Sequence, residues 1–91
     1  MDIKQFDQTH KDTLAELSTL SQSVIVHSRY KHYKGGEYVV LAVGRMEADH
    51  AEEVVVYQST DKQYTWVRPV ASFVETVTTP EYTGPRFILL P

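Results

Sequence analysis

The chain has 91 residues, a formal net charge of −3 and no cysteine. This length predicts one domain with a small core, and the lack of cysteine excludes a disulfide framework and thiolate redox or metal chemistry. The overall acidity disfavours a domain that holds nucleic acid by its phosphates, because such domains are usually strongly basic.

The first 28 residues predict an N-terminal helical extension. A capping-box pattern at Thr13-Leu14-Ala15-Glu16 predicts a helix over about 13–22, with a looser turn over about 3–10. The apolar stripe of this helix is expected to pack on the domain that follows, and a homodimer contact through it is the alternative; it consists of Leu14, Leu17 and Leu20.

The chain's beginning also bears on localisation. Its first residues lack the order of a secretory signal. The longest apolar run, Val39 to Val43, is far shorter than the roughly 20 residues of a membrane helix. We therefore predict a cytoplasmic protein with no membrane contact.

The stretch from residue 29 to residue 46 predicts a β-hairpin. Strands are expected over 29–33 and 37–46, joined at Gly35-Gly36, because glycine adopts the positive φ of a tight turn without steric cost. Both faces of the second strand are apolar, so we expect it to be covered on both sides, with a bend or bulge at Gly44. Residues 29–45 are also basic, with a net charge of +3 from Arg29, Lys31, Lys34 and Arg45 against Glu37.

The second half of the chain predicts further short strands. Strands are expected over 53–58 and 63–68, then a single helical turn over 69–73, a brief strand over 74–78, a loop over 79–85 and a last strand over 86–90. The predicted fold is mainly β with an N-terminal helix, and residues 29–91 form a small SH3-like antiparallel barrel of five to six short strands.

Several spaced motifs resemble the bacterial domain-of-unknown-function family 1653 over about residues 29–88. They are Tyr30-x-His32-Tyr33-Lys34-Gly35, Val55-Val56-Tyr57, Trp66-Val67-Arg68-Pro69 with Phe73-x-Glu75-x-Val77, and Pro85-Arg86-Phe87. The resemblance implies a small SH3-like barrel and adds no mechanism, because the family has no established activity.

The chain carries none of the familiar catalytic motifs for a nucleophile, a zinc protease or a phosphate loop. No cofactor or metal is predicted, because its four histidines are scattered. His32 is the most interesting titratable residue, since neighbouring cations such as Lys34 favour its neutral form. Its plainer interpretation is a strand histidine bonded to a loop.

Trp66 and Arg68 are predicted to share one face of a strand beside Tyr57. Together they form either a platform for a ligand or a core tryptophan capped by an arginine. Arg68 and Glu75 are expected to form a structural ion pair, and the alternative has Arg68 presenting its guanidinium to a carboxylate or phosphate, with Arg86 as a second anion contact.

These residues support three functional hypotheses. The first is a non-catalytic binding module that holds a protein or peptide segment on its aromatic and arginine surface. The second is weak binding of RNA or single-stranded nucleic acid through the basic hairpin 29–45. The third is a small enzyme that uses His32 and Glu75 as acid and base with Arg68 as an anion anchor. We favour the first, with candidate ligand-binding residues Tyr30, His32, Tyr33, Lys34, Tyr57, Trp66, Arg68, Glu75 and Arg86.

Overall fold

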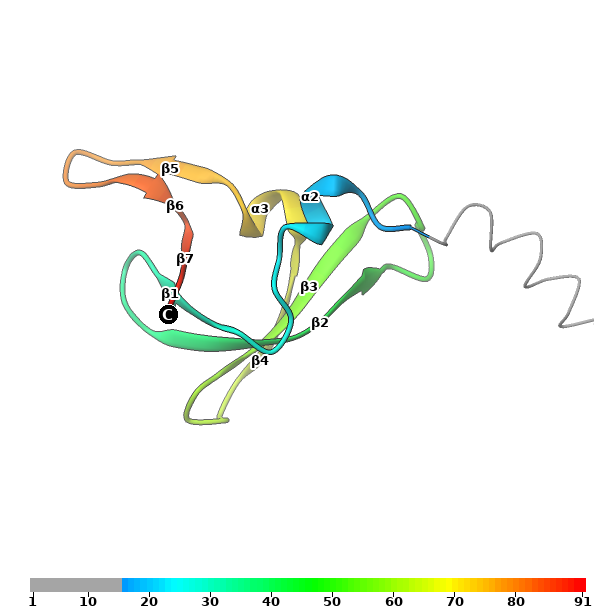
Figure 1. Ribbon diagram of the computed structural model, residues 1–91, viewed down its shortest axis with the longest axis horizontal. Helices are drawn as coiled ribbons and strands as arrows, with labels where there is room; N and C mark the ends of the chain where they lie inside the picture. The colour runs from blue at the N-terminus through cyan, green and yellow to red at the C-terminus, as the bar shows by residue number, and fades with distance from the viewer. Residues whose placement is uncertain (1–15) are drawn as a thin grey trace, which may run out of the picture.

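The computed structural model describes residues 16–91, which form two short helices and seven strands (Figure 1). The helices are α2 (Thr19–Gln22) and α3 (Val70–Phe73). The strands are β1 (Arg29–His32), β2 (Glu37–Arg45), β3 (Glu53–Ser59), β4 (Thr65–Pro69), β5 (Thr76–Thr78), β6 (Thr83–Pro85) and β7 (Phe87–Leu89).

Five strands make one antiparallel sheet in the order β4-β3-β2-β1-β7, and β5 and β6 pair as a separate hairpin. The predicted turn between β1 and β2 is confirmed, with Gly35 at φ 108° and Gly36 at φ 84°. The single turn of α3 after Pro69 is confirmed as well. In Figure 1 the β5–β6 hairpin projects from the body of the domain, while α2 and α3 lie side by side above the sheet.

The prediction of a closed SH3-like barrel is wrong, because β4 and β7 stay at opposite edges of the sheet. Side chains of α3 lie between these edges. The ring of Phe73 stacks on Phe87 of β7, with centroids 4.2 Å apart, and meets Tyr57 of β3 at 5.5 Å. Part of the loop predicted over 79–85 is the strand β6, which Gly84 and Pro85 conceal because both are rare in strands.

The predicted N-terminal helix is corrected in the part that the structure describes. Helix α2 begins at Thr19, and Leu20 is 46% exposed, so the leucine stripe does not pack on the sheet there. Ser21 faces inward instead because its hydroxyl donates to the Glu53 carboxylate. The predicted turn over 3–10 and residues 13–15 of the predicted helix lie outside the described residues.

The bulge of β2 lies at Leu41 rather than at Gly44. The register shifts between Val40 and Ala42, so the strand's alternation changes phase there. Val40 is buried, whereas Leu41 is 38% exposed, and the prediction that β2 is covered on both faces is wrong at this point.

The core lies on one face of the sheet, which we call the inner face. Tyrosine and phenylalanine rings from four strands and α3 meet there, with smaller valines around them. The buried members are Val24, Tyr30, Val40, Val55, Tyr57, Val70, Phe73 and Phe87. Two of these buried rings, Tyr57 and Phe87, also line a cleft on this face.

Candidate functional site

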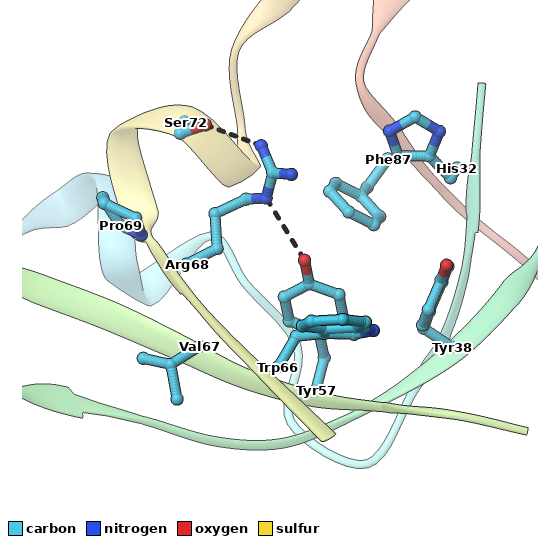
Figure 2. Close-up of a pocket in the computed structure, with 9 residues that line it drawn as sticks. All are labelled: His32, Tyr38, Tyr57, Trp66, Val67, Arg68, Pro69, Ser72 and Phe87. Atoms are coloured by element: carbon cyan, nitrogen blue, oxygen red, sulfur yellow. Dashed lines mark hydrogen bonds between the residues drawn. The ribbon is translucent and has the colours of Figure 1, made fainter. Parts of the chain in front are cut away.

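A cleft of about 520 Å³ opens on the inner face, between β4, α3 and the strands β1 and β7 (Figure 2). Its volume is in the range of small-ligand sites. The residues that line it are His32, Tyr38, Tyr57, Trp66, Val67, Arg68, Pro69, Ser72 and Phe87.

Trp66 stands at the rim of this cleft. It is paired across the ladder with Tyr57, so both side chains project to the inner face, yet Tyr57 is buried and Trp66 is 48% exposed. The Trp66 ring stacks on Tyr64, with centroids 5.7 Å apart and an interplanar angle of 16°. The interpretation of Trp66 as the largest core residue is therefore wrong.

Arg68 lies deeper in the cleft and is held by two neutral groups (Figure 2). Its Nε donates to the Tyr57 hydroxyl at 3.2 Å, and its Nη1 donates to Ser72 Oγ at 2.9 Å. The guanidinium carbon is 5.6 Å from the centroid of the Phe87 ring, a cation–π contact. Among the described residues, no carboxylate pairs with Arg68.

The predicted ion pair between Arg68 and Glu75 is wrong. Glu75 pairs with Arg86, with Nη2 and Oε1 2.5 Å apart, and Arg86 also donates from Nε to the Ser72 carbonyl at 3.1 Å. The reason is the β5–β6 hairpin, which returns the chain so that the Arg86 amide donates to the Glu75 carbonyl at 2.9 Å. This hairpin could not be seen in the sequence.

His32 closes the far side of the cleft. Its Nδ1 accepts a hydrogen bond from the Lys34 amide at 3.1 Å, and its ring packs edge-on against Phe87. Burial lowers the pKa of His32 below the ordinary 6.5, and the charges of Arg68, Arg86 and Lys34 lower it further. The ring is thus neutral near pH 7, and because Nδ1 accepts, the proton is on Nε2.

Other predicted site residues lie outside the cleft. Tyr30 is in the core, where its hydroxyl accepts from the Ile25 amide at 3.0 Å. Tyr33 stacks on Tyr82 at 5.4 Å, and the Lys34 ammonium lies 5.7 Å from the Tyr33 centroid. These two belong to a neighbouring surface that the β5–β6 hairpin completes.

The structure adds residues to the site that sequence reasoning missed. Tyr38 lies two residues before the buried Val40 on β2, and this alternation was the available signal. Ser72 and Phe87 had no such signal, because their places depend on where α3 and β7 pack.

In residues 16–91, no three His, Asp or Glu side chains gather as metal ligands. No helix in the described part of the chain is long and apolar enough to span a membrane.

Comparison with known proteins finds a family and a solved structure that the chain resembles. Residues 28–89 match the model of a protein family of unknown function, DUF1653. A crystal structure of a DUF1653 protein from Bordetella bronchiseptica is similar, with 30% sequence identity and a TM-score of 0.68 over 77% of this chain and 91% of that one. Among curated proteins, none matches the chain.

Proposed function

Because the chain belongs to the DUF1653 family, whose function is unknown, we propose its function from the cleft: it is a non-catalytic binding module that holds a protein or peptide segment. The observation that carries this proposal is the position of Trp66, half exposed at the rim of a cleft whose interior holds Arg68. An exposed aromatic ring and an arginine together are typical of the residues that dominate protein-binding surfaces.

The position of Trp66 on an edge strand favours an extended peptide. Strand β4 ends the five-stranded sheet, and within residues 16–91 no strand pairs with its outer edge. Tyr64 and Val67 are 55% and 60% exposed beside Trp66. An unpaired edge with exposed apolar side chains can add a peptide strand through its backbone groups.

The nucleic-acid alternative has less support from the arrangement of the basic residues. Arg45 lies at the end of β2 farthest from the Gly35-Gly36 turn, close to Glu53. Lys31 is paired across the ladder with Glu37. The predicted basic surface is therefore divided, which weakens the electrostatic attraction that nucleic acid requires.

The enzyme alternative also loses its proposed pair. Glu75 is engaged with Arg86 and does not line the cleft that His32 lines. A general acid and base must both reach the reacting group, so His32 and Glu75 do not form such a pair in this arrangement.

An affinity capture from the host's lysate tests the binding proposal, with and without ribonuclease. We compare the wild type with Trp66→Ala and with Leu41→Ala, a control that removes an exposed side chain outside the cleft. Capture of a defined protein that resists ribonuclease, survives in Leu41→Ala and is lost in Trp66→Ala supports the proposal.

The result depends on Trp66→Ala remaining folded, so its denaturation midpoint is measured beside that of Phe73→Ala. Removing the buried Phe73 should cost about 3–5 kcal/mol, whereas a half-exposed tryptophan should cost clearly less. Equal losses would mean that Trp66→Ala disrupts the fold, and a loss of capture would then not report on binding. Partners that vanish with ribonuclease would favour the nucleic-acid alternative instead.

A further inference from the structure

We infer that the cleft recognises a carboxylate of the bound peptide, placed against Arg68 beside an apolar side chain that contacts Trp66. This inference rests on the proposed function and names the chemistry of its ligand. Three properties of the cleft lead to it: the polarity of its hydrogen-bonding groups, its net charge and the arrangement of its rings.

The polar side chains that line the cleft have hydrogen-bond donors without an acceptor in residues 16–91. The Tyr57 hydroxyl and Ser72 Oγ each accept a hydrogen bond from Arg68, so the proton of each hydroxyl points elsewhere. His32 likewise accepts at Nδ1 and carries its proton on Nε2. Among the described residues, nothing accepts these protons or a bond from Arg68 Nη2. A ligand that fits must supply acceptors.

The charge of the cleft indicates a single negative charge on that ligand. Arg68 has no carboxylate partner in the described chain, while Arg86 is neutralised by Glu75. His32 is neutral near pH 7, and Lys34 does not line the cleft. One uncompensated guanidinium, with Nη2 left to donate, matches the single charge of a carboxylate better than the double charge of a phosphate dianion.

The rings beside Arg68 provide a place for an apolar group. Trp66 at the rim and Tyr38 opposite it face the same cleft, with Phe87 between Arg68 and His32 (Figure 2). A carboxylate on Arg68 would therefore carry a neighbouring apolar or aromatic side chain onto these rings. The carboxylate can be the free end of a chain or the side chain of an acidic residue.

Short peptides titrated against the protein test this inference. Trp66 is the single tryptophan of the chain, so its fluorescence reports directly on the cleft. The probes are acetyl-Gly-Gly-Phe with a free carboxyl end, the same peptide as the amide, acetyl-Gly-Glu-Phe-amide, and that peptide with phosphoserine in place of glutamate. We expect one or both carboxylate peptides to bind about tenfold or more tightly than the neutral amide, since hydrogen bonds to a charged group are worth that much.

Binding of acetyl-Gly-Gly-Phe would identify a free chain end as the carboxylate, and binding of acetyl-Gly-Glu-Phe-amide would identify an acidic side chain. Arg68→Gln should remove the preference for acid over amide, whereas Arg29→Gln, a matched control at an exposed position outside the cleft, should keep it. The comparison of acid with amide uses the wild type alone, so it stands even where Arg68→Gln is poorly folded.

Other outcomes overturn the inference. Equal binding of acid and amide would remove the carboxylate while leaving Trp66 as a peptide contact, so the proposed function would survive. Tighter binding of the phosphoserine peptide than of its glutamate counterpart would assign the cleft to phosphate. If neither carboxylate peptide bound, recognition of a carboxylate would be rejected. Separately, capture of a protein partner that does not depend on Trp66 would reject the proposed function.

Discussion

Two polar clusters lie at different places in this domain, and they differ in how their charges are satisfied. The Glu53 cluster, formed by Ser18, Ser21, Arg45 and Glu53, attaches α2 to the sheet. Glu53 accepts from the Ser18 hydroxyl at 2.6 Å, from the Ser18 amide at 3.1 Å and from the Ser21 hydroxyl, with Arg45 at 3.9 Å. Its charges and hydrogen bonds are complete within the chain.

The Arg68 cluster, formed by His32, Tyr57, Arg68 and Ser72, has the opposite character. Its guanidinium donates to two neutral hydroxyls, those of Tyr57 and Ser72, and in residues 16–91 no carboxylate pairs with it. A charge that meets its partner within the fold stabilises the fold. A charge held in place by neutral groups is available to a ligand, and this difference separates a structural cluster from a candidate site.

The largest effect on folding is expected in the Glu53 cluster. Glu53→Gln removes the charge that three donors share and leaves the fully buried Ser21 hydroxyl with a weaker acceptor. We expect this variant to have a lower melting temperature, measured by circular dichroism, than Glu52→Gln, Ser72→Asp or Ser72→Asn, with little change in peptide binding at Trp66. Glu52→Gln is the control, because Glu52 is exposed beside it.

The same cluster predicts an acid limit of stability. Hydrogen bonds from Ser18 and Ser21 lower the pKa of Glu53 below its ordinary 4.5, with a further contribution from Arg45. The unfolded chain therefore takes up this proton first as the pH falls, so the stabilisation is present above 4.5 and is lost below it. A wild type and a Glu53→Gln variant with parallel stability curves below pH 4.5 would contradict this account.

A smaller effect of opposite sign is expected when the Arg68 cluster receives an acid of its own. Ser72 Oγ is already 2.9 Å from Arg68 Nη1, so Ser72→Asp places a carboxylate beside the guanidinium. We expect a gain of about 0.2–1 kcal/mol in the free energy of unfolding, the range measured for exposed ion pairs. The same carboxylate would occupy the position of the ligand and abolish peptide binding.

Ser72→Asn controls for size in this experiment, since it has the same shape without the charge. It should neither stabilise the domain nor block acidic peptides by occupying Arg68. If Ser72→Asp stabilised the fold yet bound the acidic peptides as well as the wild type does, Arg68 would not be their anchor.

The sequence predicted the larger sheet more closely than the packing around it. The Gly35-Gly36 turn and the flanking strands follow from local chemistry, so their positions were close to those observed. The leucine stripe predicted a helix facing the sheet through its apolar side, but the hydrogen bonds to Glu53 turn the Ser21 side inward. The prediction of a closed barrel was wrong because β4 and β7 remain separate edges of the sheet. The stacking of Phe73 on Phe87 is a long-range contact, which leaves no periodic signal in the sequence.

The candidate site shows the same division. Trp66, Arg68 and Tyr57 were grouped correctly because alternation along one strand and its neighbour fixes which side chains share a face. The partner of Glu75 was wrong because the β5–β6 hairpin, hidden by Gly84 and Pro85, decides it. Local periodicity therefore predicted the face, and tertiary packing decided which charges on it are satisfied.

The smallest expected effect is the change in stability that accompanies protonation of His32, a member of the Arg68 cluster. Burial, followed by the charges of Arg68, Arg86 and Lys34, lowers the pKa of His32 in the folded state. The unfolded chain therefore binds this proton from about pH 6.5 downward, whereas the folded protein resists it, so stability should decline modestly as the pH falls below 6.5. Denaturant unfolding at a series of pH values measures this decline, and His32→Gln should remove it.

Arg68→Gln should reduce the decline without abolishing it, because burial is the larger cause of the lowered pKa. A bound acidic peptide should reduce it too, since a carboxylate beside Arg68 offsets the repulsion that His32 meets on protonation. An acidic peptide that binds at Trp66 but leaves the pH dependence unchanged would lie away from Arg68 and His32. The titration thus distinguishes a ligand that enters the Arg68 cluster from one that only rests on the exposed edge of β4.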